Sequence, residues 1–277
     1  MSARARAAFR LALRGMHIFP LAVGAKVPPA GSHGLLDASN DADVARARWA
    51  KQPSPNIGIA TGAKSGVWVL DVDVQHDGPE TLTTLEAEHG ALPVTITAST
   101  PRGGRHYYFK WPVDGPEIRS SAGRIGAGLD GRGEGGYVVA PPSVLDAGRR
   151  YSWIRNGAHA FAEAPQWLIE LALPPPLPPR AEPRPINGDV TRYVASAVAA
   201  ELDGLDRSQP GQRNNALNVC AFKIGQFVGA GALPEDWAQA ELERHAVGLG
   251  LTPSEIKRTI ASGFRAGLRA PRELPHG

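Results

Sequence analysis

The sequence predicts an α+β domain followed by a small all-α domain, and three observations support this fold class. In residues 1–172, short segments of strand character cluster with few helices between them, which favours α+β over a doubly wound parallel sheet. Residues 173–189 are dense in proline, as expected for a stiff, extended linker. Residues 190–277 lack strand alternation and show helical spacing. We therefore expect two domains joined by the linker.

Local patterns predict the individual elements of the first domain. Apolar runs rich in β-branched and aromatic residues predict strands at residues 17–21, 57–61, 68–74, 94–100, 106–111 and 137–140. Helices are expected at residues 3–14, 41–51, 80–89 and 165–173. Asp41 would cap the second of these helices, and Gly90 would close the third. Glycine-rich loops are expected at residues 102–104 and 126–136.

Four helices are expected in the second domain, at residues 190–202, 213–229, 235–247 and 254–268. In the last of them, apolar residues recur every four positions and predict a face turned to the core: Ile256, Ile260, Phe264 and Leu268. Three arginines accompany this stripe and are candidate DNA contacts: Arg258, Arg265 and Arg269. They form either an ordinary solvated face or a phosphate-contacting one, and the sequence leaves both open.

Composition excludes several classes of protein. The 277 residues hold 30 basic and 27 acidic side chains, and a net charge of +3 is only weak evidence for a polyanionic partner. A single cysteine, Cys220, excludes an internal disulfide framework and a Cys-rich zinc site, and it is expected to be a small buried hydrophobe. No apolar run is long enough for a membrane span, and residues 1–14 lack the apolar core of a signal peptide. We expect a cytoplasmic protein.

The strand expected at residues 68–74 carries two carboxylates, Asp71 and Asp73. Aspartate is depleted in strands and costly to bury without a partner, so the pair needs an explanation. Residues two apart on a strand share a face, which would place their Cα atoms roughly 6–7 Å apart. That spacing suits a pair of divalent ions about 3.5–4 Å apart. The pair therefore predicts a metal site that handles phosphates.

Two glycine motifs suggest nucleotide binding but lack the required context. Residues 126–131 match the dinucleotide pattern G-x-G-x-x-G, yet more glycine and a strand follow where a helix is needed. Residues 58–65 approximate a P-loop, with Ala63 where its second glycine should stand and a strand following. We reject the first and interpret the second as a turn between strands.

Two further motifs carry chemistry. In residues 103–109 a glycine loop delivers Arg105 and His106 to the start of a strand. In residues 128–143 another acid, Asp130, lies among glycines beside Arg132, ahead of an apolar strand. Glycines at these points allow close approach of a ligand to the backbone.

In this order and spacing, the motifs of residues 10–155 resemble the archaeo-eukaryotic primase superfamily. The closest likeness is to the bifunctional primase–polymerase domain of phage and plasmid replication proteins. The matching segments are IFPL with K-x-P at residues 18–28, NIGIATG at 56–62, LDVD at 70–73, GRH at 104–106 and GYVVAPPS at 136–143. The resemblance implies a primase-like catalytic domain, with an RRM-like sheet and a second α/β subdomain, followed by a helical accessory domain.

The resemblance also implies roles for individual residues. Asp71 and Asp73 match the first catalytic motif, and Asp130 matches the acid of the third, so these three would ligate two Mg²⁺ or Mn²⁺ ions. His106 matches the second motif and would contact the phosphates of the incoming nucleotide. Further candidate nucleotide contacts are Arg105, Arg132, Ser120, Arg124 and Lys26. Gly131 departs from the family pattern, where a bulkier apolar residue is common, and the zinc-binding cysteines of some relatives are absent.

The implied function is a template-dependent primase and DNA polymerase that makes primers de novo and extends them on single-stranded DNA. Its partners would be a single-stranded template, a primer and (d)NTPs. Either a separate replicative helicase acts with it, or the chain is part of a longer primase–helicase, since no true P-loop is present. Two alternatives remain open at this point: a metal-dependent phosphohydrolase or nuclease, and a non-catalytic DNA-binding replication-initiator module.

Overall fold

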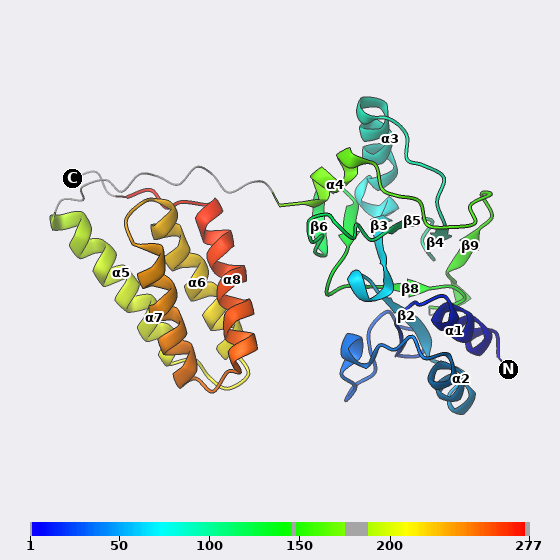
Figure 1. Cartoon of the computed structure of the whole chain (residues 1–277), viewed down its shortest axis with the longest axis horizontal. Helices are drawn as coiled ribbons and strands as arrows, with labels where there is room; N and C mark the ends of the chain where they lie inside the picture. Colours follow the sequence, from blue (N-terminus) through cyan, green and yellow to red (C-terminus); the bar gives the residue numbers. More distant parts are fainter. Residues whose placement is uncertain (1, 146–147, 175–187, 275–277) are drawn as a thin grey trace. The chain divides into compact units, whose positions relative to one another are not determined.

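The computed structural model describes residues 2–145, 148–174 and 188–274 (Figure 1). The chain divides into two compact units, residues 1–174 and 175–277. Most of the proline-rich segment expected as a linker, residues 175–187, lies outside the described residues. No helix within the described ranges is long and apolar enough to cross a membrane.

A six-stranded antiparallel sheet forms the centre of the first unit, with strand order β6-β7-β3-β5-β4-β9. Its strands are β3 (Val67–Val72), β4 (Thr97–Ser99), β5 (Arg105–Lys110), β6 (Ser121–Gly126), β7 (Leu129–Arg132) and β9 (Ser152–Ile154). A second antiparallel sheet has the order β1-β2-β8, with β1 (Ile18–Leu21), β2 (Asn56–Ala60) and β8 (Tyr137–Ala140). These sheets and the helices around them confirm the α+β class.

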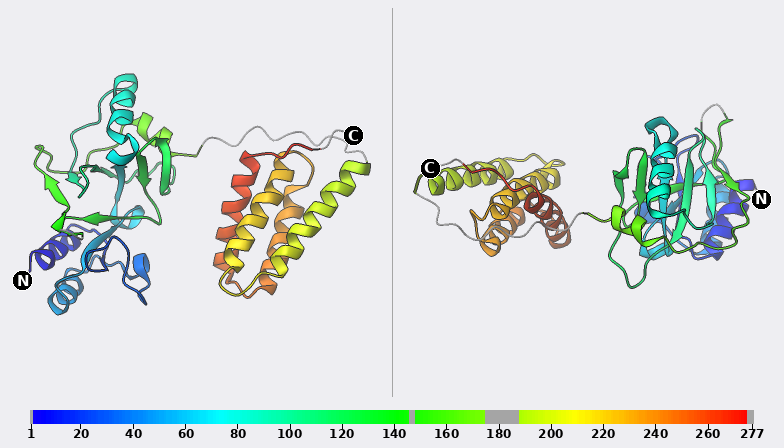
Figure 2. Two further views of the ribbon diagram at one scale, coloured as in Figure 1. Left: turned by 180° about the vertical axis from the view of Figure 1, so that it is seen from behind. Right: turned by 90° about the horizontal axis from the view of Figure 1, so that it is seen from above.

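Helices cover the two sides of this unit differently. The helices α1 (Ala3–Leu13) and α2 (Ala42–Lys51) lie with the three-stranded sheet on one side, and α3 (Gly78–His89) and α4 (Gln166–Ala172) lie on the other (Figures 1 and 2). Asp41 caps α2 by accepting from the N–H groups of Asp43 and Val44, as predicted. Short 3-10 turns occur at η1 (Gly34–Asp37), η2 (Ala63–Ser65) and η3 (Val74–His76).

The central strand β3 is buried on both faces, and its alternation decides where Asp71 lies. Trp68, Leu70 and Val72 pack in the core with α3 and α4. Val67 and Val69 pack in the opposite core, which includes α1 and α2. Because side chains alternate along a strand, Asp71 continues the face of Val67 and Val69.

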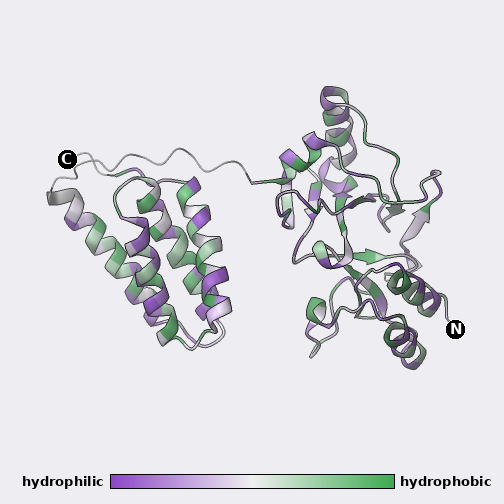
Figure 3. Ribbon diagram, viewed as in Figure 1, coloured by the Kyte–Doolittle hydropathy of each residue, from purple (hydrophilic) through white to green (hydrophobic). Residues whose placement is uncertain are grey.

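The second unit consists of helices α5 (Gly188–Asp206), α6 (Arg213–Gly229), α7 (Glu235–Gly248) and α8 (Pro253–Arg269). Their apolar residues form one core, while hydrophilic residues lie on other sides of the helices (Figure 3). In α8 the expected stripe is in this core, with Ile256, Ile260 and Phe264 buried and Leu268 packed against them. Helices α6 and α8 approach closely through Gly225, Gly263 and Gly267.

Several sequence-based expectations for elements were wrong. Residues 121–126 and 129–132 form the hairpin β6–β7, although most of this segment was expected to be a glycine-rich loop, and β9 was not predicted. The expected strand at residues 94–100 is reduced to β4. Of the two discarded glycine motifs, residues 61–66 form a turn that links β2 to β3 through η2, whereas only residues 127–128 of the other motif form a turn, which links β6 to β7. In the turn at residues 61–66, the Ala63 N–H donates to the Glu134 carboxylate.

Candidate active site

Three motif residues lie in one row across the six-stranded sheet. Asp71 of β3 is paired with His106 of β5 on one side and with Asp130 of β7 on the other. Residues directly opposite each other on neighbouring strands point to the same face, so the three side chains share one face of the sheet. Asp71 and Asp130 are therefore neighbours, although Asp130 lies on a strand and not in the expected turn.

Asp71 is held by two basic side chains. Arg132 Nη2 donates to Asp71 Oδ2 at 3.4 Å and to Asp130 Oδ2 at 2.8 Å. His106 Nε2 lies 3.4 Å from Asp71 Oδ1, and the Asp71 side chain is only 24% exposed. Burial raises the pKa of the Asp71 carboxyl, but the hydrogen bond and charge of His106 and the charge of Arg132 outweigh it and leave the pKa below its ordinary value. Asp71 is therefore ionised at neutral pH.

Asp73 lies just beyond the end of β3, so the expectation that both acids lie on one strand was wrong. It caps the turn η3: the Gln75 N–H donates to Asp73 Oδ1 at 2.9 Å, and His76 Nδ1 lies 3.1 Å from Asp73 Oδ2. The hydrogen bond from Gln75 is the main reason that the pKa of Asp73 is lowered. The main chain of Asp73 is fixed by a second contact, its N–H donating to Gly128 O at 2.8 Å.

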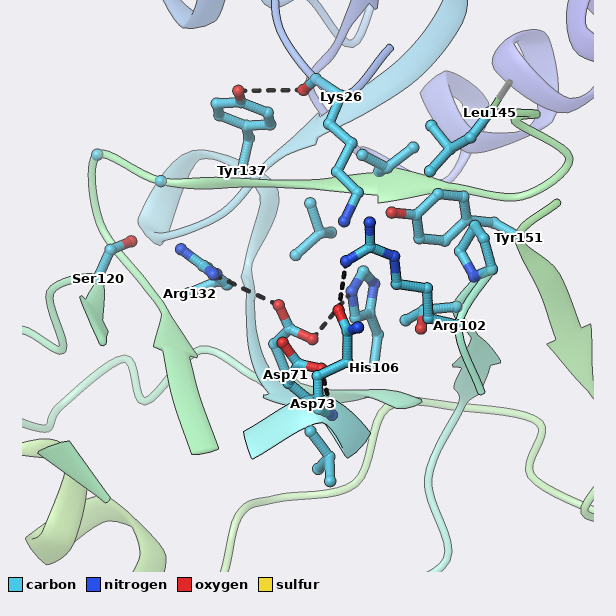
Figure 4. A pocket seen from close by; sticks show the side chains of 18 residues that line it. Lys26, Asp71, Asp73, Arg102, His106, Ser120, Arg132, Tyr137, Leu145 and Tyr151 are labelled. Carbon is cyan, nitrogen blue, oxygen red and sulfur yellow. Dashed lines mark hydrogen bonds and ion pairs between the residues drawn. The ribbon is translucent and has the colours of Figure 1, made fainter. Parts of the chain in front are cut away.

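Asp71 and Asp73 both line a cavity of about 420 Å³ (Figure 4). Four basic side chains also line this cavity: Lys26, Arg102, His106 and Arg132. Lys26 and Arg102 come from separate loops, and their side chains point into the same space above the two acids. The two positively charged side chains repel each other, and an anionic ligand between them would offset that repulsion. The cavity is therefore suited to an anionic ligand.

Four of the candidate nucleotide contacts lie in the cavity wall, and two do not. Lys26, Ser120, His106 and Arg132 line the cavity. Arg105 pairs with Val72 of β3, which places it on the opposite face of the sheet, where its Nη1 donates to Tyr107 Oη at 3.2 Å. Arg124 is exposed on β6 outside the cavity wall.

Two cavity residues, Arg102 and Tyr151, were not predicted from the sequence. Arg102 belongs to the glycine loop before β5 and donates to the Gln75 side chain, which follows Asp73. Tyr151 is 2% exposed and lies beside His106, with 5.7 Å between ring centroids. Burial, followed by the charge of Asp71, raises the pKa of Tyr151. The arginine within the glycine loop was a usable signal, whereas nothing in the local sequence distinguished Tyr151.

The acids fit a divalent cation in their chemistry, because Mg²⁺ and Mn²⁺ prefer carboxylate oxygens. Asp71 and Asp73 share the cavity, but Asp130 does not line it; its oxygens accept from Arg132 and from the Gly123 N–H. Across the described part of the chain, no three His, Cys, Asp or Glu side chains are grouped as a metal site. In this arrangement, therefore, Arg132 occupies the position between Asp71 and Asp130.

In the second unit, the candidate DNA contacts lie on the outer side of α8. Arg258 and Arg265 are exposed, and Arg269 is partly exposed. The face opposite to them carries the buried residues Ile256, Ile260 and Phe264. This position is compatible with both an ordinary solvated face and a phosphate-contacting face.

The first unit is an α+β domain in which a row of two acids and a histidine lies beside a basic cavity suited to an anionic ligand. The family model for the N-terminal domain of bifunctional DNA primase/polymerases matches residues 8–167, more than half of the chain. The chain therefore belongs to this family, which consists of nucleotidyltransferase-type enzymes acting on DNA and nucleotides. A search of curated proteins found no match.

Proposed function

We propose that this protein is a template-dependent primase and DNA polymerase, which makes primers de novo and extends them on single-stranded DNA. The observation that carries the proposal is the cavity, where Asp71 and Asp73 lie beside four basic side chains. A nucleoside triphosphate brings several negative charges, which the basic side chains can neutralise. The lowered pKa of each acid keeps it charged and available for a cation.

The proposed reaction joins a 3′-hydroxyl to the α-phosphorus of the incoming nucleotide. The new P–O bond forms as the bond to the β-phosphate oxygen breaks, so pyrophosphate leaves and the hydroxyl proton passes to solvent or to a nearby carboxylate. Lys26 and Arg102 are the side chains placed to hold the triphosphate, because both point into the cavity from loops. His106 orients the Asp71 carboxylate from the neighbouring strand and would contact the phosphates.

Two Mg²⁺ or Mn²⁺ ions are part of the proposal, with Asp71 and Asp73 as ligands and Asp130 as the third acid. Such ions supply positive charge at the attacking and leaving oxygens. For Asp130 to join the set, Arg132 must give up its contact with Asp71 and Asp130 or turn toward the phosphates. Electrostatics favours this exchange, because bound cations would neutralise the Asp71 and Asp130 carboxylates in place of the Arg132 guanidinium.

The helical unit would assist primer initiation by holding template and nucleotide. The proposed phosphate contacts are three arginines of α8: Arg258 and Arg265, which are exposed, and Arg269, which is partly exposed. Replacing all three with glutamine should weaken single-stranded DNA binding and initiation on unprimed templates. Extension of an annealed primer should change little, since its 3′ end is presented to the first unit. Equal loss of both activities would contradict the separate role of this unit.

The proposal is tested by incorporation of labelled nucleotides on primed and unprimed single-stranded templates. The wild-type protein should extend primers and also start new ones, and Asp71→Asn with Asp73→Asn should abolish both. Asp114→Asn makes the same type of substitution at one position in an exposed loop outside the cavity wall and should retain activity. Degradation of the oligonucleotide without extension would instead indicate a nuclease. DNA binding without any turnover would indicate a replication-initiator module.

A further inference from the structure

The outer strand of the six-stranded sheet carries an exposed tryptophan in the same row as Asp71. Trp153 of β9 pairs with Ala98 of β4, which pairs with His106 of β5 and through it with Asp71 of β3. All four side chains therefore lie on one face. Trp153 packs against Tyr108, with 5.4 Å between ring centroids, but remains 41% exposed.

The segment around Trp153 combines aromatic and basic residues and contains no acid. Residues 149–155 read Arg-Arg-Tyr-Ser-Trp-Ile-Arg, and all three arginines are exposed. Tyr151 lies two positions before Trp153 and lines the cavity beside His106. Arg155 follows Trp153 at the same two-residue spacing and lies just beyond the end of β9. The segment therefore leads from Tyr151 in the cavity wall to the exposed side chains of Trp153 and Arg155.

An exposed aromatic ring flanked by arginines suits single-stranded nucleic acid, because unpaired bases stack on the ring and phosphates contact the cations. We propose that residues 151–155 hold the single-stranded template, with Trp153 as the stacking platform and Arg155 as a phosphate contact. This inference rests on the proposed function, since it assigns the template of that same site. Duplex DNA keeps its bases stacked on each other and offers no free face to Trp153.

The sheet geometry gives the distance at which the template should meet Trp153. Three strand spacings separate β9 from β3, and at roughly 4.8 Å each they place Trp153 about 14 Å from Asp71. With stacked bases roughly 3.4 Å apart, this corresponds to about four nucleotides. A template overhang shorter than that should not reach Trp153.

Binding to a fluorescent 20-nucleotide oligothymidine, followed by anisotropy with the full chain and without nucleotide or metal, tests the proposal. Trp153→Ala should weaken binding by about 5-fold or more, while Trp153→Phe keeps a ring and should retain most of the affinity. Trp237→Ala is the matched control, because Trp237 is 44% exposed but lies in the helical unit. Its affinity should stay within about 2-fold of wild type.

Salt dependence separates the roles of the two residues. Loss of one phosphate contact to single-stranded DNA should reduce the slope of log affinity against log salt by about 0.7, so Arg155→Ala should show this change. Trp153→Ala should lower affinity with the slope unchanged. On primed templates, Trp153→Ala should slow extension only where the overhang exceeds about four nucleotides.

Unchanged oligothymidine binding by folded Trp153→Ala protein would overturn the inference, as would an equal loss for Trp237→Ala or for a duplex of the same length. Thermal unfolding of each variant shows whether it is folded. If Trp153→Ala is not folded, the salt slope of Arg155→Ala decides, and an unchanged slope would overturn the inference. Because binding is measured without turnover, the two proposals fail separately. A wild-type protein that incorporates no nucleotide contradicts the proposed function alone, whereas an active polymerase with Trp153-independent binding contradicts this inference alone.

Discussion

Gly128 holds the loop that begins at Asp73 in place, and replacing it should reduce the proposed activity through Asp73. Gly128 lies in the turn between β6 and β7, with φ +66°, and its carbonyl accepts from the Asp73 N–H. A Cβ at this position would lie 2.4 Å from His76 O and 2.5 Å from Gly78 N. Both atoms belong to backbone, so neither can move aside as a flexible side chain would. The hairpin and the loop after Asp73 must separate.

The required movement follows from these distances. Ordinary contact begins at 3.4 Å, so the closest pair must separate by 1.0 Å (3.4 minus 2.4). A displacement of about 1 Å at a catalytic group can reduce turnover about 100-fold. For stability, Gly128→Ala should cost about 1 kcal/mol for the left-handed backbone, about 1–3 kcal/mol for overpacking and about 1 kcal/mol for the lost hydrogen bond.

Gly66→Ala is the matched control for this prediction. Gly66 has φ +63°, and nothing lies within 4 Å of its added Cβ, so only the backbone cost of about 1 kcal/mol should appear. The assay compares thermal unfolding and the rate of single-nucleotide incorporation for both variants. The first unit of Gly128→Ala should unfold about 4–16 °C below that of Gly66→Ala and should incorporate nucleotide far more slowly. Equal losses in the two variants would refute the proposed positioning of Asp73.

Other predictions concern the second unit. Gly267→Ala should destabilise it by about 1–3 kcal/mol, because the new Cβ would lie 2.1 Å from a backbone oxygen of α6, whereas Gly204→Ala has open space and should be neutral or stabilising in a melt. Burial raises the pKa of the Cys220 thiol to about 12, so a thiol reagent at pH 8 should react only after denaturation, and rapid reaction of the native protein would contradict this. Thr252→Ala removes the capping box formed with Glu255 and should cost about 1 kcal/mol in denaturant unfolding; no measurable loss would show that α8 does not depend on this cap.

Local sequence patterns were sufficient where one periodicity dominated. The stripe beginning at Ile256 has the helical repeat, and it predicted the buried side of α8. The apolar run that leads to Asp71 predicted a strand. It overestimated the length of that strand, because Asp73 accepts a hydrogen bond from the Gln75 N–H and starts a turn. Local patterns do not show where a side chain will hydrogen-bond to the backbone and so end a strand.

Strands β6 and β7 were missed because their stability comes from pairing with distant parts of the chain. Both are rich in glycine, which has a low strand propensity, yet β7 pairs with β3 along its whole length. This pairing places Asp130 opposite Asp71 and brings Arg132 between them. The motifs could indicate which acids belong together, but the contact made by Arg132 depends on the register of two strands. Tyr151 and Trp153 depend on pairing at the sheet edge in the same way.

The central claim is that the Asp71 cavity performs templated nucleotidyl transfer, and single-nucleotide incorporation tests it most directly. Wild-type protein would be mixed with a primed template, one labelled dNTP at a time and Mg²⁺ or Mn²⁺, with pyrophosphate release followed alongside primer extension. We predict incorporation of the nucleotide complementary to the template, one pyrophosphate for each nucleotide added, and a loss of about 100-fold or more in Asp71→Asn. Undiminished incorporation by Asp71→Asn would contradict the account.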